Sequence, residues 1–363
     1  MDLRTQMAGA TRAGELWRAS ADGAVICDAC AFHCRIAAGA EGVCKVRFNR
    51  DGVLYAPWGY VAGYLIEPVE KKPFFHASPG ARTLSFGTLG CNLHCDYCQN
   101  WTTSQTLRDS AAGSPLLRCS PDALVARALE AGAGVVVATY NEPLIAVEWS
   151  VEVMRAAKAH GLLTAFVSNG QASPQVLEYI RPWVDCYKVD LKSFNDAEYR
   201  SFGGRLSPVT GTIRRLHDMD FWVEVVTLLV PGLNDSGAEL RSVADFLACV
   251  SPDIPWHLTA YHKDYRMQDP RNTLPEDLTR AAAIGKAAGL RYVYAGNKAG
   301  KVESFESTWC AGCGAELVRR RGYRTLECRI GPDGACPECR RPVPGRWAPA
   351  IRQPALLPVL SDF

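Results

Sequence analysis

Short apolar segments alternate with longer amphipathic segments between residues 82 and 297. The apolar segments are rich in valine, leucine and phenylalanine, and near-continuous runs of this kind predict strands that are buried on both faces. The amphipathic segments predict helices, and the first of them opens with Ser120 and Pro121, residues that helices favour at the N-cap and the first helical position. The expected strands are 81–88, 134–140, 162–169, 186–192, 221–231, 255–262 and 291–297. The expected helices are 120–133, 143–161, 173–183, 207–219, 236–250 and 275–289.

This series of strand–helix units predicts an α/β fold with a parallel sheet, closed as a full or partial (β/α) barrel of the TIM type. Most of the expected strands end in polar residues that a hydrophobic core would not favour. In such a barrel the carboxyl ends of the strands meet at one mouth, where the chemistry is found. We therefore expect a functional site at these strand ends: Asn141 and Glu142, Ser168 and Asn169, Asp190 and Lys192, Thr227, Tyr261 and His262, and Asn297.

Charge and hydropathy exclude several classes of function. Forty Lys and Arg residues against 38 Asp and Glu residues give a formal charge of +2, so no global field favours nucleic acid or an anionic membrane. The N-terminus lacks the apolar segment of a signal peptide, and no run of apolar residues is long enough to span a bilayer. These features predict a cytoplasmic protein that does not insert into membranes.

Cysteine is the residue type that points to chemistry. Eleven of the fifteen cysteines fall into three sets, and in a long chain from a reducing compartment such sets indicate metal sites rather than disulfides. The remaining four, for which small buried hydrophobes are the simplest interpretation, are Cys119, Cys186, Cys249 and Cys328. The sets are Cys27, Cys30, Cys34 and Cys44; Cys91, Cys95 and Cys98; and Cys310, Cys313, Cys336 and Cys339.

The middle set lies in one short loop after the first expected strand. Cys91, Cys95 and Cys98 can reach three corners of a single iron–sulfur cubane and leave one iron without a protein ligand. An incomplete ligand shell is what distinguishes catalytic from structural metal sites. The alternative is a zinc or ferredoxin-type site whose fourth ligand is His94 or a residue elsewhere in the chain.

The spacing Cys91-x3-Cys95-x-Tyr97-Cys98, placed after the first strand of a βα series, resembles the signature of the radical S-adenosylmethionine (SAM) enzymes. This resemblance implies that the three cysteines hold a 4Fe–4S cluster, that SAM chelates the fourth iron, and that Tyr97 lies near the adenine. It also implies reductive cleavage of SAM to methionine and a 5'-deoxyadenosyl radical, which abstracts a hydrogen atom. The cofactors carry this chemistry, while the protein positions the radical and excludes water.

Further segments resemble the relatives of pyruvate formate-lyase activating enzyme: "EPVEKKPFFHASPG", "CQNW", "TYNEP", "FVSNG", "KVDLK", "LLVPGLND" and "YHKDYRM". Within that branch, the N-terminal "CDAC", "HC" and "GVCKVR", the segment "PWHLTAYHKDYRM" and the C-terminal cysteine pairs are similar to the radical enzymes of the AmmeMemoRadiSam system. The resemblance covers residues 20–347. That family is named for the two companion protein families with which it is encoded, and its substrate is not settled by sequence.

The resemblance implies roles for the strand-end residues. Asn141 and Glu142 correspond to the residues that bind the amino group of SAM, although the usual Gly-Gly-Glu is replaced here. Ser168 and Asn169 correspond to the position that contacts its carboxylate or ribose. Asp190 and Lys192, two residues apart and so on one face of a strand, resemble charged residues near the methionyl and ribose groups; a structural ion pair is the alternative. His262 matches a histidine that faces the substrate.

The other two sets have four thiols each. Cys310, Cys313, Cys336 and Cys339 form two Cys-x2-Cys pairs, a pattern typical of a zinc ribbon that serves folding and docking. Five arginines make this region basic, and a solvated charged face is favoured over nucleic-acid binding: Arg319, Arg320, Arg321, Arg340 and Arg341. Cys27, Cys30, Cys34 and Cys44, with His33 as a substitute ligand, fit either zinc or an auxiliary 4Fe–4S cluster. We favour zinc there, because relatives with auxiliary clusters hold them elsewhere in the chain.

These observations divide the chain into an N-terminal four-cysteine extension (1–80), the radical SAM barrel (81–300), a zinc ribbon (301–350) and an extended tail (351–363). The predicted function is that of a radical SAM enzyme with an unidentified substrate. Activation of a glycyl radical enzyme is one alternative, and a zinc-rich nucleic-acid-binding module is a remote one. The predicted partners are an electron donor such as flavodoxin or ferredoxin and, in addition, a protein substrate or the companion proteins of the AmmeMemoRadiSam system.

Overall fold

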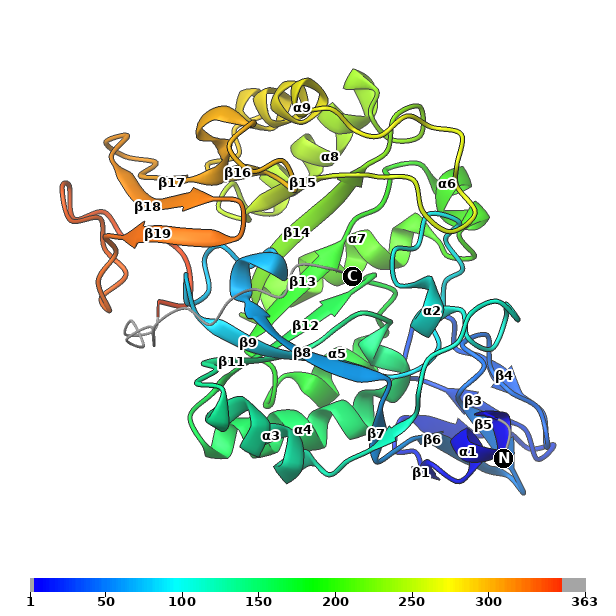
Figure 1. Cartoon of the computed structure of the whole chain (residues 1–363). Coiled ribbons are helices and arrows are strands. Elements are labelled where there is room, and N and C mark those ends of the chain that lie inside the picture. The colour runs from blue at the N-terminus through cyan, green and yellow to red at the C-terminus, as the bar shows by residue number, and fades with distance from the viewer. Residues whose placement is uncertain (1–2, 348–363) are drawn as a thin grey trace.

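An eight-stranded sheet forms the centre of the computed structural model, which describes residues 3–347 (Figure 1). The strand order is β16-β15-β14-β13-β12-β11-β9-β8; neighbouring strands from β9 to β16 are parallel, and β8 pairs antiparallel with β9. The two outer strands, β8 and β16, do not pair, so the sheet is an open, partial barrel and the fully closed alternative is wrong. The tail predicted for 351–363 lies outside the described residues. The strands are β8 (Gly63–Pro68), β9 (Arg82–Gly87), β11 (Val135–Ala138), β12 (Leu163–Ser168), β13 (Cys186–Asp190), β14 (Trp222–Leu229), β15 (Trp256–Ala260) and β16 (Val293–Gly296).

Helices follow the parallel strands, as the alternating pattern predicts. Several begin at a serine whose hydroxyl accepts a backbone N–H three residues on, as Ser120 does from Ala123 at 3.2 Å, which satisfies a donor of the first turn. The helices and 3₁₀ turns of this part are η1 (Val69–Lys71), α2 (Trp101–Ser104), α3 (Pro121–Glu130), η2 (Pro143–Ala146), α4 (Val147–Ala159), α5 (Pro174–Ile180), α6 (Asp196–Ser201), α7 (Leu206–Asp218), α8 (Gly237–Val250), α9 (Pro275–Ala287) and η3 (Glu303–Glu306). No helix among the described residues has the length and apolar character needed to cross a membrane.

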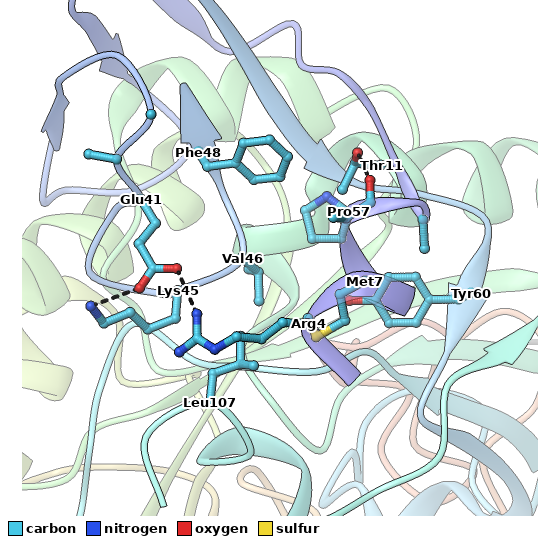
Figure 2. Close-up of a pocket in the computed structure, with 14 residues that line it drawn as sticks. Arg4, Met7, Thr11, Glu41, Lys45, Val46, Phe48, Pro57, Tyr60 and Leu107 are labelled. Atoms are coloured by element: carbon cyan, nitrogen blue, oxygen red, sulfur yellow. Dashed lines mark hydrogen bonds and ion pairs between the residues drawn. The ribbon is translucent and has the colours of Figure 1, made fainter. Parts of the chain in front are cut away.

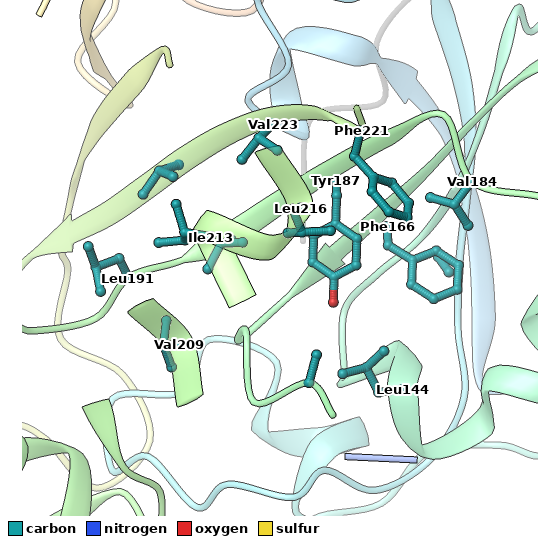
Figure 3. Close-up of a cluster of buried hydrophobic side chains, with 14 of the residues drawn as sticks. Leu144, Phe166, Val184, Tyr187, Leu191, Val209, Ile213, Leu216, Phe221 and Val223 are labelled. Carbon is teal, nitrogen blue, oxygen red and sulfur yellow. The ribbon is translucent and has the colours of Figure 1, made fainter. Parts of the chain in front are cut away.

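The two faces of the sheet are covered differently. Helices cover the outer face, where Phe166 of β12, Tyr187 of β13 and Phe221 pack against α7 (Figure 3). Burial of each such ring contributes roughly 1.5–3 kcal/mol. Because side chains alternate along a strand, the neighbour of Tyr187, Lys188, points to the inner face, where it is fully buried.

The inner face is covered by the chain itself, through the segment 69–77. Phe74 packs there on the inner side chains of β11, β12 and β13. The Lys188 ammonium donates to the carbonyl oxygen of Lys72 at 2.6 Å. The carboxylate of Glu224 accepts the backbone N–H groups of Phe75 and His76 at 3.0 and 2.9 Å. Polar side chains that would be costly in an apolar core are thus satisfied by the backbone of this segment.

The C-terminal ribbon docks on the same segment. It consists of β17 (Thr308–Trp309), β18 (Glu316–Arg321) and β19 (Arg324–Cys328). Phe75 and Tyr294 share one buried cluster with Cys310 and Cys336 of the ribbon. Arg320, one of the five arginines of the basic ribbon, is buried and donates to the carbonyl oxygen of Phe75 at 2.7 Å. It therefore serves docking rather than a solvated face.

The N-terminal region forms two small antiparallel sheets, which lie at the opposite end of the central sheet from the ribbon (Figure 1). Arg47 attaches this region to the barrel through a bidentate ion pair with Glu148 of α4 at 2.7 Å, and both side chains are only 2% exposed. The elements are α1 (Leu3–Ala8), β1 (Thr11–Ala13), β2 (Trp17–Ala19), β3 (Val25–Cys27), β4 (Arg35–Ile36), β5 (Phe48–Arg50) and β6 (Val53–Pro57), followed by β7 (Tyr60–Val61), which pairs with β10 (Leu117–Arg118).

Candidate functional site

The loop that contains Cys91, Cys95 and Cys98 begins directly after β9, at the carboxyl edge of the sheet. Cys95 is buried and the other two are partly buried. The backbone N–H of Leu93 donates to the sulfur of Cys91 at 3.4 Å, and the sulfur of Cys98 lies 3.2 Å from the hydroxyl of Ser104. These donors favour sulfur that carries negative charge, as in a metal-bound thiolate.

The loop fits an iron–sulfur cluster better than a single ion. Burial raises the pKa of Cys95 to about 12, so its thiolate needs a strong positive charge nearby, which metal ions supply. Next to Cys91, the Nδ2 of Asn92 is buried and has no hydrogen-bond partner among the described residues. The three thiols form no group of ligand atoms within 4.8 Å of one another, with or without His94, whose side chain is exposed. Thiols that bind different irons of one cluster can lie this far apart, whereas thiols that bind one zinc ion cannot.

Glu142 links the ends of two neighbouring strands. Its carboxylate accepts the hydroxyl of Ser168 and the backbone N–H of Asn169, both at 2.8 Å. Burial raises the pKa of Glu142 to about 7, so the group is poised between its neutral and ionised forms. The side chain of Asn169 in turn donates to Asn92 at 2.7 Å, beside Cys91. Three of the residues predicted for SAM thus lie together next to the cysteine loop.

Asn141, the fourth predicted SAM residue of this edge, has a different neighbourhood. Its amide oxygen accepts the N–H of Thr88 at 3.1 Å, and its amide nitrogen donates to the Thr88 hydroxyl and the Gly90 carbonyl at 3.0 and 2.9 Å. Both donors and the acceptor are engaged within the protein. Asn141 therefore holds the start of the cysteine loop in place.

Asp190 and Lys192 lie on the same side of the chain at the end of β13, as their spacing predicts. The Lys192 ammonium is 3.4 Å from Asp190 and lies over the ring of Tyr97 at 5.9 Å. Burial alone would lower the pKa of Lys192, but Asp190, Tyr97 and Cys95 raise it well above its usual range. A permanent positive charge is therefore fixed beside the cysteine loop.

His262 is placed differently from the residues above. It is exposed, and its Nδ1 lies 3.2 Å from the carbonyl oxygen of Lys263. The segment that follows it reaches the cysteine loop instead: the N–H groups of Arg266 and Met267 both donate to the Asp96 carbonyl at 3.0 Å. Tyr265 stacks on Trp101 at 5.1 Å. The sequence did not predict that this segment packs on the cysteine loop, although the segment contains the stretch "YHKDYRM".

The C-terminal set is a compact four-thiol site. The sulfur atoms of Cys310, Cys313, Cys336 and Cys339 all lie within 4.8 Å of one another, with Cys310–Cys339 at 3.6 Å and Cys313–Cys336 at 3.7 Å. Zinc bonds of 2.3 Å in a tetrahedron place sulfurs about 3.8 Å apart. Burial would raise the pKa of Cys310, but the N–H groups of Cys313 and Gly312 lower it to about 7. The donor set fits a tetrahedral zinc ion.

The N-terminal set is spaced more widely. Cys27 ends β3, Cys34 precedes β4, and Cys44 lies in the turn before β5; all but Cys34 are buried. These thiols form no group of three within 4.8 Å. His33, which sequence suggested as a substitute ligand, instead places its Nδ1 2.8 Å from the carboxylate of Asp28.

A cavity of about 550 Å³ lies away from the strand ends, between the N-terminal region and the loop after the cysteines (Figure 2). Arg4 and Lys45 line it, and both are paired with Glu41, at 3.6 and 3.1 Å. Both cations share the single carboxylate of Glu41, and among the residues that line the cavity there is no cysteine or histidine. The chemistry of the chain is concentrated at the cysteine loop instead.

An open parallel α/β sheet with a three-thiol metal loop at its carboxyl edge is the arrangement of a metal-dependent enzyme. The sequence model of the Radical SAM superfamily matches residues 86–247, which run from β9 into α8 and include this loop. An uncharacterized protein of Methanocaldococcus jannaschii is 34% identical over 301 residues, 82% of this chain and 88% of that protein. The chain belongs to the radical SAM superfamily and is an iron–sulfur enzyme of that class.

Two further similarities concern particular relatives. The pyruvate formate-lyase-activating enzyme of Staphylococcus epidermidis is 25% identical over 195 residues, which are 51% of this chain and 76% of that enzyme. The crystal structure of Streptococcus suis SuiB bound to the precursor peptide SuiA aligns with a TM-score of 0.49 at 11% identity, over 64% of this chain and 52% of SuiB.

Proposed function

We propose that this enzyme cleaves SAM reductively and uses the resulting 5'-deoxyadenosyl radical to abstract a hydrogen atom from its substrate. The observation that carries the proposal is the convergence of Cys91, Cys95 and Cys98 with Glu142 and Lys192 at one edge of the sheet. When bound, a 4Fe–4S cluster at the three thiols supplies the electron that cleaves the sulfonium. Membership of the superfamily supports the same reaction.

The chain's own residues supply binding and orientation. Asp190 and Glu142 are carboxyl groups that can accept hydrogen bonds from SAM, while Lys192 offers a fixed positive charge for its carboxylate. We propose that Ser168 and Asn169, the latter bonded to Asn92 beside Cys91, contact the carboxylate or ribose of SAM. We assign Asn141 a positioning role, because its amide is engaged with Thr88 and Gly90. His262 remains a proposed substrate-side residue.

Anaerobic reconstitution with iron and sulfide, followed by dithionite and SAM, tests the proposal. The wild-type enzyme is expected to form 5'-deoxyadenosine and methionine. Cys95→Ala is expected to form none, and Cys249→Ala, which changes an exposed cysteine outside the three sets, is the matched control. Product formation by Cys95→Ala at the wild-type rate would contradict the assignment of the loop.

Activation of a glycyl radical enzyme is the second candidate, and the similarity to pyruvate formate-lyase-activating enzyme favours it. We prefer a different substrate, within the AmmeMemoRadiSam system, because the N-terminal and C-terminal cysteine sets lie outside the matched superfamily core of residues 86–247. The 34% identical archaeal relative extends over 82% of this chain and so beyond that core, as expected for a branch with additional regions. Appearance of a glycyl radical by electron paramagnetic resonance in a coexpressed partner would reverse this preference.

A further inference from the structure

We infer that Cys27, Cys30, Cys34 and Cys44 hold a second iron–sulfur cluster, adjacent to the radical SAM loop, and that this cluster passes electrons to it. These cysteines lie outside residues 86–247, which the superfamily model matches. Four thiols in one place fit zinc or iron–sulfur by donor chemistry alone. The geometry of the site and its location distinguish the two.

Spacing is the first distinction. In the ribbon, four sulfurs lie within 4.8 Å of one another, as one shared ion requires. Among the described residues, the N-terminal thiols form no such group, a property they share with Cys91, Cys95 and Cys98. Thiols that each bind a different iron of a cubane stand farther apart than thiols that share one ion. The N-terminal set therefore resembles the iron–sulfur loop and differs from the zinc site of the same chain.

The four thiols nevertheless surround one space. The N–H of Cys27 donates to the carbonyl of Cys34 at 3.0 Å, which joins the first and third ligands across two strands. A Cβ atom added to Gly42 would lie 3.5 Å from the sulfur of Cys34, so that thiol contacts the turn that carries Cys44. Cys30 is buried, within electrostatic range of the other three thiols. Ligands from three segments thus converge as a closed set.

Donors for the negative charge of a cluster are present as well. The Arg47 guanidinium lies within electrostatic range of Cys27 and Cys44. The Nε of Arg47 is buried and has no hydrogen-bond partner among the described residues, although both terminal nitrogens of its guanidinium are bonded to Glu148. Hydrogen bonds to sulfur and nearby cations are the means by which proteins tune iron–sulfur potentials.

The position of the set points to electron transfer. A Cβ atom added to Gly90, the residue before Cys91, would lie 3.0 Å from the carbonyl oxygen of Cys44, so the two cysteine segments touch. Phe32 packs on the hydrophobic cluster that contains Cys95 and Tyr97. On the other side, Lys45 lines the cavity of Figure 2, and the two chain neighbours of Cys44, Val43 and Lys45, are 41% and 39% exposed. The site lies between solvent and the radical loop.

A ligand shell of four thiolates leaves no open iron for a substrate, so this cluster exchanges electrons only. A low-potential one-electron donor of the flavodoxin or ferredoxin type loses one electron, which reduces the N-terminal cluster. That cluster is reoxidised when the electron moves to the radical SAM site, and no atoms are transferred. This role rests on the proposed function, whereas the presence of the second cluster does not.

Metal analysis of a variant that lacks the radical SAM ligands tests the cluster by itself. In Cys91→Ala/Cys95→Ala/Cys98→Ala, the N-terminal set is intact, and we expect about four irons and one zinc per chain, from one cubane and one ribbon. Reduction should produce the electron paramagnetic resonance signal of a single 4Fe–4S cluster. An iron-free protein, with or without a second zinc, would overturn the inference even if the wild type cleaves SAM.

The relay is tested in Cys34→Ser, which changes the most accessible ligand of the set. The rate of 5'-deoxyadenosine formation is to be measured with reduced flavodoxin and with dithionite, which can reduce the radical SAM cluster without the N-terminal cluster. The ratio of the two rates is expected to fall about tenfold in Cys34→Ser and to stay unchanged in Cys249→Ser. An unchanged ratio in Cys34→Ser, with the N-terminal cluster lost by iron analysis, would overturn the relay.

Discussion

The two four-cysteine regions of this chain offer the same four thiol ligands, but the thiols are close together in the C-terminal set and farther apart in the N-terminal set. The C-terminal thiols crowd within 4.8 Å of one another, and two of them, Cys313 and Cys339, are exposed. The N-terminal thiols are more widely spaced and three of the four are buried, and the backbone carbonyl of Cys44 lies next to Gly90 of the radical SAM loop. A count of cysteines thus predicts a metal site, while the spacing of the thiols indicates which metal they fit.

Loss of the metal from the C-terminal ribbon is expected to have the largest effect on stability. Cys310→Ala/Cys336→Ala should lose the zinc ion and with it on the order of 10 kcal/mol of metal-binding free energy, because zinc binding and folding of such ribbons are coupled. We expect residues 301–347 to become sensitive to protease while the iron content stays at the wild-type value. Cys249→Ala is the control. A parallel loss of iron would show that the two regions are not independent.

Breaking the buried ion pair of the N-terminal region should have the next largest effect. Arg47→Met leaves Glu148 buried and uncompensated, which costs about 3–5 kcal/mol in comparable cases. Arg127→Met, which removes an exposed pair with Glu130, should leave stability unchanged in urea unfolding. We also expect iron to be lost from the Arg47 variant and zinc to be retained. Equal stabilities of the two variants would contradict the anchoring role of Arg47.

Gly90→Ala probes the contact between the two cysteine segments. The glycine has φ +91°, and a Cβ atom would lie 2.8 Å from Val46 Cγ1 and 3.0 Å from the Cys44 carbonyl. Gly59→Ala is the matched control, because Gly59 has φ +71° but nothing within 4 Å. The backbone strain is common to both variants, so the crowding should add about 1–3 kcal/mol of destabilisation in Gly90→Ala. Equal urea midpoints would show that the segments separate freely.

The smallest expected effect is a change in how the stability of the fold depends on pH. It concerns Glu224, which accepts hydrogen bonds from the segment on which the ribbon docks. Burial raises the pKa of Glu224, but the hydrogen bond with His257 outweighs it and lowers the pKa to about 2. A carboxyl group with a depressed pKa stabilises the fold above its usual value of 4.5 and loses that contribution as the pH falls towards 2. Glu224→Gln should therefore be less stable than wild type at pH 7, and the difference should shrink by about 2 kcal/mol between pH 7 and pH 3. A constant difference would contradict the depressed pKa.

The arrangement of strands and helices could be predicted from the sequence, because apolar runs and capped amphipathic segments report local structure. Asp190 and Lys192 could be placed together because residues two apart share a strand face. The contact of Gly90 with Cys44 could not be predicted, since it depends on how two loops far apart in sequence meet. His262 lies two residues beyond the end of β15 at Ala260, in an exposed segment, and its substrate-side role stays a prediction.

The contacts of buried polar side chains also could not be predicted from the sequence. Lys188 and Glu224 lie within strand segments, and their sequence neighbours are apolar, so nothing local shows that they face the segment 69–77. The open shape of the sheet accounts for these contacts. Because no closed barrel surrounds the inner face, another part of the chain has to cover it.

The direction of a single strand determines which cysteine set meets which end of the sheet. β8 runs antiparallel to β9, so its first residue, Gly63, pairs with Gly87 at the carboxyl end of β9, and its last, Pro68, pairs with Arg82 at the amino end. The described residues before β8 therefore lie near the carboxyl edge, where the loop of Cys91 begins, and the segment after β8 lies at the edge where the ribbon docks. A parallel β8 would have exchanged these destinations. The polarity of one edge strand thus places the N-terminal and the C-terminal cysteine sets at opposite ends of the sheet.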